Sequence, residues 1–317
     1  MSSEQLMART TIGLTPGLLA AIYVFGLGIL FNVLFAILIA VMLEFVLQRL
    51  LGHPFSRVAT SSGCLAAVLL ALCLPPLLPL SYVALGVGFA LIFGKYVYGG
   101  LGQNLFNPAM VGYAALLLTA PLALSQWLPE SGITPDLETL LAIKLQLQPV
   151  DGYTGATALD LLRNRGALTI EEYWLTAETV FSDQMLIGSA YLLGGIYLIQ
   201  AKIINYQLPL AMLLGLLIPS LLAFDGGSSS SLGSPILHFF AGATLLGAFF
   251  IITDPVSSPN TPAGIITYGL LIGLLTFLIR GFGAYPDGLA FAVLLANACG
   301  PLLDHTARHW QKTRRTI

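Results

Sequence analysis

The chain has 317 residues, of which 56% are hydrophobic and only 9% are charged. Soluble domains carry roughly one-quarter charged residues, and apolar runs of about 20 residues, long enough to cross a bilayer as helices, recur along this chain. This composition excludes an ordinary soluble domain and predicts an all-α, polytopic membrane protein, and the net charge of −2 gives no reason to expect a nucleic-acid partner.

Apolar runs bounded by charges, prolines or glycine clusters predict about ten transmembrane helices. They lie near residues 12–29, 31–50, 62–75, 79–98, 106–124, 185–201, 206–224, 235–252, 263–280 and 287–304. The third ends at Pro75–Pro76 and the eighth at Asp254–Pro255, and proline removes a backbone donor and disfavours a helical residue before it. We therefore expect these two segments to be interrupted helices.

A long polar segment, residues 125–184, separates five predicted helices from five others. An odd number of helices in each half is what two inverted repeats require, and the interrupted third and eighth helices hold corresponding positions. The sequence thus predicts a first five-helix repeat at 1–124, a segment outside the membrane at 125–184, and a second repeat with a tail at 185–317.

Basic residues predict the orientation of the chain. With both termini in the cytoplasm, nine of the thirteen Lys and Arg residues fall on the cytoplasmic side: Arg9, Arg49, Arg57, Lys95, Lys202, Arg308, Lys312, Arg314 and Arg315. The segment 125–184 then faces outward. It carries nine of the fifteen acidic residues: Glu130, Asp136, Glu138, Asp151, Asp160, Glu171, Glu172, Glu178 and Asp183.

Two polar stretches, "YGGLGQNLFNPAMVGY" (98–113) and "FFIITDPVSSPNTPAG" (249–264), should meet at the cytoplasmic side. Glycines and the amides of Asn104 and Asn107 could approach a flat polar ligand; alternatively, Asn107 caps the next helix with Pro108 in its first position. Asp254 near membrane depth is a functional candidate because an unpaired charge there is costly; alternatively, it caps a turn.

Three further features have structural interpretations. Glu44 lies within about a turn and a half of Arg49 and could pair with it or reach the interface. His238 has no second His or Cys at ligand spacing, so we expect a packing residue. Cys64, Cys73 and Cys299 show no C-x-x-C spacing, so the sequence predicts no metal or iron–sulfur site in this chain.

The outer segment contains "DGYTGATALD" (151–160), a stretch that is rich in small residues and in threonine hydroxyls. Gly152 and Gly155 favour an accessible turn, Ala156 adds no bulk, and Thr157 presents a hydroxyl, which suits enzymatic modification. Alternatively, Thr154 or Thr157 caps a helix. The segment contains no histidine, so a Ser-His-Asp type triad is excluded.

"DGYTGAT" resembles the flavinylation motif, Asp followed by Ser/Thr-x-Ala-Thr, of a known family. The family contains the B subunit of the sodium-translocating NADH:quinone reductase and the D subunit of the Rnf electron-transport complex. "YGGLGQNLFNPAM", "LLGAFFIITDPVSSP" and "YPDGLAFAVLLAN" resemble its other signature segments in the same order, so the similarity covers nearly the whole chain. The length, with only a short N-terminal extension, favours the Rnf branch.

The resemblance implies a set of cofactor-binding residues. Thr157 would carry FMN through a phosphoester bond, attached on the periplasmic face by a separate flavin transferase. A second, non-covalent flavin, riboflavin in the quinone reductase, would lie near the cytoplasmic polar stretches. The matching positions are Asp151, Thr154, Gly155, Ala156 and Thr157 for FMN, and Asn104, Asn107 and Asp254 for the second flavin.

The resemblance further implies a redox subunit, not active alone, in a bacterial inner membrane. Its complex would couple electron transfer between ferredoxin and NAD to movement of Na⁺ or H⁺. Partners would be membrane and peripheral subunits, including a second covalent-FMN subunit and iron–sulfur subunits. The alternative from another class is a ten-helix channel or transporter for a small polar solute with no covalent cofactor.

Overall fold

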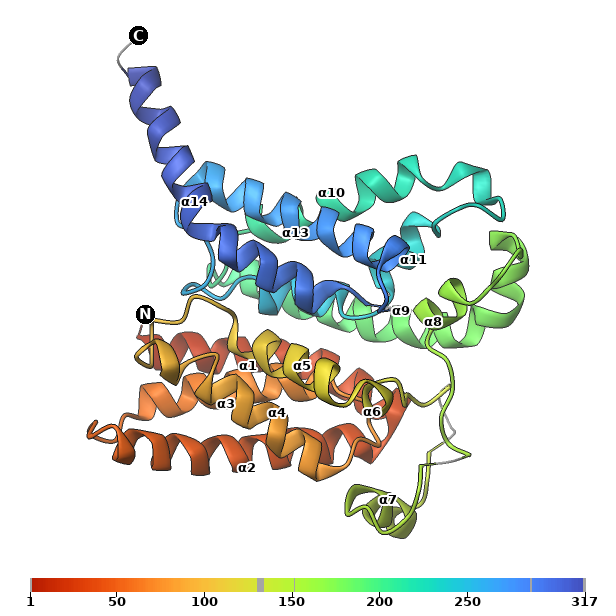
Figure 1. The fold of residues 1–317 in the computed structure, drawn as a ribbon, viewed down its shortest axis with the longest axis horizontal. Helices are drawn as coiled ribbons and strands as arrows, with labels where there is room; N and C mark the ends of the chain where they lie inside the picture. The colour runs from red at the N-terminus through yellow and green to blue at the C-terminus, as the bar shows by residue number, and fades with distance from the viewer. Residues whose placement is uncertain (1, 130–133, 151, 286, 316–317) are drawn as a thin grey trace.

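The computed structural model describes residues 2–129, 134–150, 152–285 and 287–315, with side chains up to residue 309. Within these ranges the regular secondary structure is helical, apart from one isolated β-bridge between Trp127 and Gly155, and turns and loops connect the helices. The helices form two stacked groups (Figure 1). The first group comprises α1 (Ser3–Phe25), α2 (Leu27–Leu50), α3 (Arg57–Leu72), α4 (Leu80–Ile92), the 3₁₀ turn η1 (Tyr96–Tyr98) and α5 (Pro108–Thr119).

The second group follows three short helices, of which the last two lie in the long polar segment 125–184. These are α6 (Pro121–Leu124), α7 (Leu137–Lys144) and α8 (Ala158–Arg163). The second group comprises α9 (Ile170–Gln200), α10 (Gln207–Leu222), the 3₁₀ turn η2 (Asp225–Gly227), α11 (Pro235–Phe240), α12 (Thr244–Leu246), the π-helical η3 (Gly247–Ile251), α13 (Pro262–Phe282) and α14 (Leu289–Arg315).

The bundle has two distinct ends. Both chain termini lie at one end, which we call the terminal end, whereas α7 and α8 lie at the opposite end, which we call the loop end (Figure 1). The groups are joined where α1 packs against α9. A Cβ atom at Gly194 would overlap the carbonyl oxygen of Gly13, so these two helices approach closely because neither position carries a side chain.

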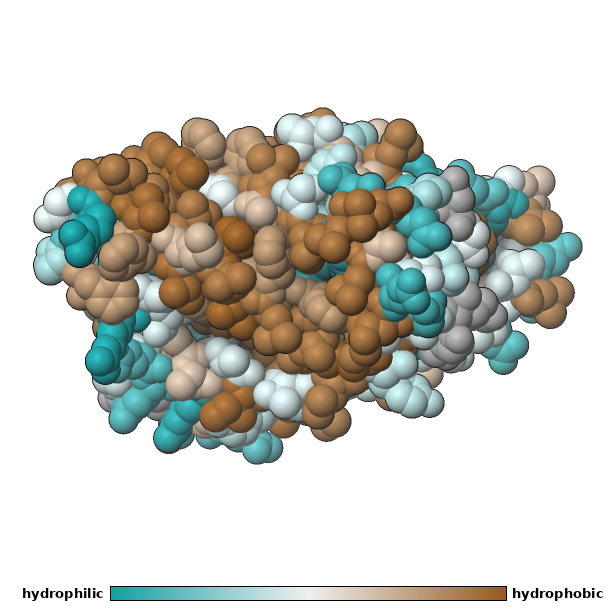
Figure 2. Space-filling view, turned by 90° about the horizontal axis from the view of Figure 1, so that it is seen from below, coloured by the Kyte–Doolittle hydropathy of each residue, from teal (hydrophilic) through white to brown (hydrophobic). Residues whose placement is uncertain are grey.

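The helices have the length and surface of a membrane protein. Within the described ranges, five are long and apolar enough to cross a bilayer: Ser3–Phe25, Leu27–Leu50, Leu80–Tyr98, Pro262–Phe282 and Leu289–His309. Leu34, Leu38 and Met42 of α2 point outward and are more than half exposed. Figure 2 shows apolar side chains over most of the face below the first group, with hydrophilic residues toward the ends. The predicted all-α, polytopic membrane fold is confirmed.

Both predicted interruptions are present. α3 ends at Leu72, before Pro75–Pro76. The predicted eighth helix is not one helix that ends at Asp254, however, because it already breaks between α11 and α12, where Gly242 has a φ of 62°. Arg280 of α13 donates hydrogen bonds to the carbonyl oxygens of His238 and Ala241, which α11 leaves without helical partners.

Three predicted boundaries are wrong. α1 begins at Ser3, well before residue 12, because Ser2 and Gln5 form a capping box. α9 begins at Ile170 and not near 185, because Thr169 and Glu172 form a second capping box there. α14 continues past the predicted end at 304 to Arg315.

Both interpretations of Glu44, pairing with Arg49 and reaching the interface, are also wrong. Glu44 is fully buried, and its Oε1 lies 2.6 Å from Nζ of the equally buried Lys95. Tyr96 donates its hydroxyl hydrogen to the other carboxylate oxygen at 2.6 Å. A buried carboxylate requires a cation and hydrogen-bond donors, and the residues after α4 provide both, whereas Arg49 stacks on Phe45 near the surface.

Candidate functional site

Thr157 is the N-cap of α8, as one of the sequence alternatives predicted. Its Oγ1 accepts a hydrogen bond from the backbone N–H of Asp160 at 3.2 Å and donates one to Asp160 Oδ2 at 2.7 Å. Its backbone N–H donates to the same Oδ2 at 3.0 Å, which completes a capping box. The half-buried Thr157 hydroxyl is therefore held in one orientation.

Glycine at position 155 permits the turn to dock on the end of the first group. Its N–H donates to the carbonyl of Trp127 at 2.9 Å, and a Cβ atom at 155 would overlap Pro129. Gly152 has a φ of 90°, a conformation that favours glycine. Thr154 and Ala156 are exposed, and Asp151 lies outside the described residues.

The helix that begins after Thr157 is anchored on α9. Ala158 and Leu159 are buried, and the Tyr173 hydroxyl donates to the carbonyl of Ala158 at 2.9 Å. Leu161 and Leu162 pack against the same small cluster. Because α9 continues into the second group, Thr157 has a fixed position relative to the bundle.

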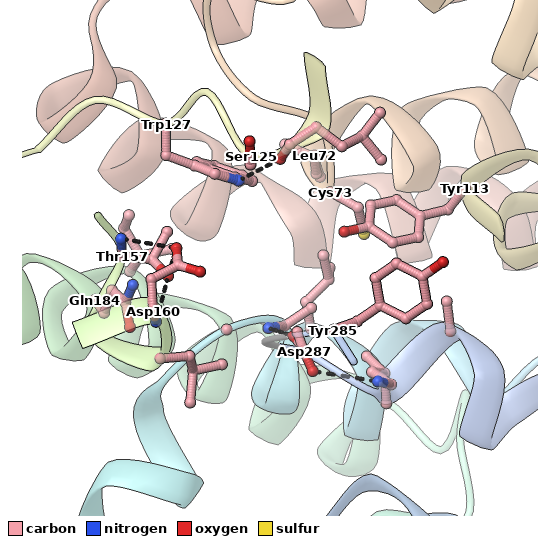
Figure 3. Close-up of a pocket in the computed structure, with 18 of the residues that line it drawn as sticks. Leu72, Cys73, Tyr113, Ser125, Trp127, Thr157, Asp160, Gln184, Tyr285 and Asp287 are labelled. Atoms are coloured by element: carbon pink, nitrogen blue, oxygen red, sulfur yellow. Dashed lines mark hydrogen bonds between the residues drawn. The ribbon is translucent and has the colours of Figure 1, made fainter. Parts of the chain in front are cut away.

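A cavity of about 390 Å³ opens beside Thr157 at the loop end, between the two helix groups (Figure 3). Tyr113 of α5 lines it from the first group, and Tyr191 of α9 and Leu289 of α14 line it from the second. Thr157 and Asp160 lie at its rim. Ligand pockets span roughly 300–1,000 Å³ and are mostly apolar with a few polar groups, so this cavity can hold a flat aromatic ring system.

Two polar side chains in the cavity wall differ in their hydrogen bonding. Asp287 accepts from Arg280 Nε at 3.2 Å and from the backbone N–H of Ala243 at 2.9 Å, so its carboxylate is engaged. Gln184 lines the wall near Thr157, and its buried Oε1 has no partner among the described residues. Gln184 therefore offers an acceptor to a bound molecule.

The other predicted residues meet at the terminal end. Asn104 Nδ2 donates to Asp254 Oδ2 at 3.3 Å, and Asn107 Nδ2 donates to the carbonyl of Ile251 at 2.9 Å. The predicted meeting of the stretches 98–113 and 249–264 is thereby confirmed. We call this group of contacts, together with those of Asn297 below, the polar seam.

The alternative structural roles of Asn107 and Asp254 are both present. Asn107 Oδ1 accepts from the N–H of Met110 at 3.2 Å, with Pro108 in the first position of α5. Asp254 accepts from the N–H of Val256 at 3.3 Å and from the Ser257 hydroxyl at 3.0 Å. Both residues therefore serve as caps within the chain, and a second, non-covalent flavin at Asn104, Asn107 and Asp254 stays a prediction.

Sequence reasoning missed Asn297, the centre of the polar seam. This fully buried side chain accepts from the N–H of Asn107 at 3.0 Å and donates to the carbonyl of Ser257 at 3.2 Å and to the Tyr268 hydroxyl at 2.6 Å. The available signal was an asparagine inside an apolar run, which requires partners when it is buried. Gln184 gave a similar but weaker signal.

His238 packs in the core, as predicted. Its Nε2 lies 2.9 Å from the carbonyl oxygen of Leu232, and its ring meets Phe277 edge to face. Its Nδ1 has no partner among the described residues. The ring belongs to the packing around Arg280 and not to the Thr157 site.

The fold and the site define an all-α membrane protein with two helix groups and a hydroxyl fixed at the rim of the cavity between them. The sequence model of the NQR2, RnfD, RnfE family matches residues 1–312. The chain belongs to this family.

Curated relatives resemble the chain along most of its length. A protein of Aeromonas hydrophila, named as the D subunit of an ion-translocating oxidoreductase complex, is 42% identical over 327 residues, which cover 96% of this chain and 93% of the relative. A protein of the same name from Pseudomonas paraeruginosa is 43% identical, with 92% and 87% covered. A third, from Sodalis glossinidius, is 41% identical, with 96% and 93% covered.

Proposed function

We propose that this chain is a membrane flavoprotein subunit of an ion-translocating oxidoreductase complex of the Rnf type, and that Thr157 carries FMN as a phosphoester. Family membership and the names of the relatives support the complex. The flavinylation motif at 151–157 supports the cofactor. The subunit is a redox relay and is not active alone.

The observation that carries the proposal is that Thr157, whose Oγ1 would bridge to the phosphate, lines the cavity of about 390 Å³. FMN, when bound, supplies a group that exchanges electrons singly or in pairs. The residues present fit it: the apolar and aromatic walls suit a flat ring, and Gln184 Oε1, which has no partner in the described part of the chain, is an acceptor for a ring N–H. A covalent bond at Thr157 keeps such a group at this end of the bundle.

In this proposal the two helix groups are inverted repeats, residues 1–124 and 185–317, in a bacterial inner membrane. The termini are cytoplasmic, and the segment with Thr157 is periplasmic. The complex transfers electrons between ferredoxin and NAD and moves Na⁺ or H⁺, and a flavin transferase attaches the FMN. Iron–sulfur subunits and a second covalent-FMN subunit are the neighbours through which electrons enter and leave.

Thr157→Ala tests the attachment directly, because it removes the atom that bridges to the phosphate. The variant, expressed with the transferase, should insert and assemble, with a loss of stability of about 1 kcal/mol, as for a lost N-cap. It should lack flavin fluorescence in a denaturing gel and the added mass of FMN on the 157 peptide. Thr157→Ser should keep part of the label.

Thr154→Ala is the matched control, because its exposed hydroxyl lies in the same turn and is not the bridging atom. It should still carry covalent FMN, and at most its labelling slows because the transferase recognises the turn less well. Covalent FMN on Thr157→Ala, or an unmodified mass for the wild-type peptide, would refute the assignment. A channel or transporter without a covalent cofactor would show no fluorescent band in any of these chains.

A further inference from the structure

The Thr157 hydroxyl is paired with a carboxylate. Asp160 Oδ2 accepts the hydroxyl hydrogen at 2.7 Å, and the N–H groups of Asp160 and Thr157 hold both side chains in place (Figure 3). A hydroxyl within hydrogen-bond reach of a base that is itself oriented is the arrangement that activates a serine or threonine nucleophile. Both residues line the cavity, whose wall also contains Gln184 Oε1, an acceptor without a partner among the residues that the structure describes.

Formation of a phosphoester at Thr157 requires that Oγ1 lose its proton. A neutral threonine hydroxyl is a weak nucleophile, and a positioned base contributes roughly 10²–10⁴-fold to such a step. The donor must also be activated, because a free phosphate monoester has no good leaving group. A flavin pyrophosphate, in which a nucleoside monophosphate leaves from the FMN phosphorus, has the required chemistry.

We propose that Asp160 is the base that receives the Thr157 proton when FMN is attached. Thr157 Oγ1 forms a bond to the FMN phosphorus, the anhydride P–O bond of the flavin pyrophosphate breaks, and the nucleoside monophosphate leaves with that bonding pair. The proton passes from Oγ1 to Asp160 Oδ2 and then to water, with no oxidation or reduction. This inference rests on the proposed covalent FMN and adds the residue of this chain that prepares the acceptor.

The chain contains a matched pair that separates this role from helix capping. Thr169 Oγ1 donates to Glu172 Oε2 at 2.9 Å, and Glu172 N–H donates back to Thr169 Oγ1 at 3.3 Å, which gives the same capping box at the start of α9. Neither residue lines the cavity. An effect of capping alone should therefore be similar at the two boxes, whereas a chemical role should be confined to Asp160.

The test measures the initial rate of FMN attachment to the full chain in membranes, with purified flavin transferase and a flavin dinucleotide, followed by in-gel fluorescence. Asp160→Asn keeps the size of the side chain and an oxygen for the Thr157 N–H, but it removes the carboxylate. Its rate should fall by about tenfold or more near neutral pH. Glu172→Gln should stay within about twofold of wild type, and Asp160→Glu should recover part of the rate because a carboxylate is restored.

The pH profile excludes a merely structural effect. Without a carboxylate to accept the proton, hydroxide must remove it, so the ratio of the Asp160→Asn rate to the wild-type rate should rise with pH by up to about tenfold per unit. Two outcomes would overturn the inference. In the first, Asp160→Asn is labelled at the wild-type rate. In the second, its rate is lowered, but the ratio to the wild-type rate does not change with pH and Asp160→Glu does not recover the rate. In either case a labelled wild-type chain leaves the proposed function standing, whereas an unlabelled wild-type chain removes both.

Discussion

The boundary between the helix groups differs at the two ends of the bundle. At the loop end the groups are separated by a cavity of about 390 Å³ lined by Tyr113, Tyr191 and Leu289. At the terminal end they are bound together by the polar seam, in which Asn297 bonds to Asn107 from the other group. One boundary is therefore hollow at one end and closed at the other.

The difference follows from the side chains that meet at each end. Asparagine amides carry donors and acceptors, and when they are buried they bring backbone groups of both halves into contact to satisfy them. Aromatic and aliphatic side chains impose no such requirement, so a concave apolar wall can persist if a ligand fills it. The terminal end thus holds the two groups together, and the loop end contains the cavity in which we propose that FMN is bound.

Asn297→Leu should give the largest effect, because it opens the polar seam. The change leaves the Asn107 N–H, the Ser257 carbonyl and the Tyr268 hydroxyl without their partner, and each buried group left unsatisfied costs about 1–3 kcal/mol. We expect a loss of about 3–5 kcal/mol, seen as a lowered unfolding temperature in detergent.

Asn205→Ala is the matched control for Asn297→Leu. Asn205 is exposed, and its Oδ1 accepts from the N–H of Gln207 at 3.0 Å, so water can replace the lost bond. Its cost should be under about 1 kcal/mol. Equal melting temperatures for the two variants would show that the polar seam does not hold the groups together.

Gly155→Ala should have the next largest effect and should act at the loop end. The added methyl group would overlap Pro129 and force the turn away from Trp127, at a cost of about 1–3 kcal/mol. Covalent labelling of Thr157 should fall because the acceptor turn is displaced.

Gly152→Ala lies in the same turn and tests whether strain alone explains that result. A Cβ atom at this position would have no neighbour within 4 Å among the described residues, and the φ of 90° is what opposes alanine there. It should cost about 1 kcal/mol. If both variants label equally, contact with Pro129 does not position Thr157.

Features set by neighbouring residues could be predicted from the sequence, and features set by distant ones could not. The Asn107 cap followed by Pro108 and the Thr157 cap depend on a few adjacent residues. The start of α9 could also have been predicted, because Thr169 and Glu172 stand at capping-box spacing, but the hydrophobic run alone placed it near residue 185. The pair of Glu44 with Lys95 and the bonds of Asn297 join helices far apart in the chain, and no local pattern specifies them.

Lys144 gives a pH-dependent test of how the outer segment is held on the first group. Its ammonium donates to Asn32 Oδ1 at 2.5 Å and to the Leu78 carbonyl at 2.9 Å, and burial lowers the pKa of Lys144 from 10.5 to about 7. Between about pH 7 and 10.5 the unfolded chain binds this proton and the folded chain does not. The free energy of unfolding should therefore rise with pH across that window, by at most about 1.4 kcal/mol per pH unit.

Lys144→Met provides the reference for that slope, because it keeps an apolar chain of similar length without the titrating group. Melting curves of both proteins at pH 6, 7.5 and 9 should show the wild type gaining stability relative to the variant as the pH rises. Parallel curves would mean that the ammonium stays charged in the folded state and that docking of α7 does not depend on its proton.

Asp254→Asn should have the smallest effect on stability and decides whether the terminal end has any role besides cohesion. The introduced amide keeps an oxygen for the Val256 N–H, and the Ser257 hydroxyl can reverse its bond, so only the contact with Asn104 is weakened, at a cost below about 1 kcal/mol. The complex should therefore assemble with its covalent FMN.

Because the change deletes a charge near membrane depth, we expect ion transport per electron to fall while the melting temperature stays near that of wild type. Transport driven by the oxidoreductase in vesicles, compared with Asn205→Ala, measures this directly. Normal coupling would leave Asp254 as the cap of its turn, and the terminal end would then serve only to hold the two groups together.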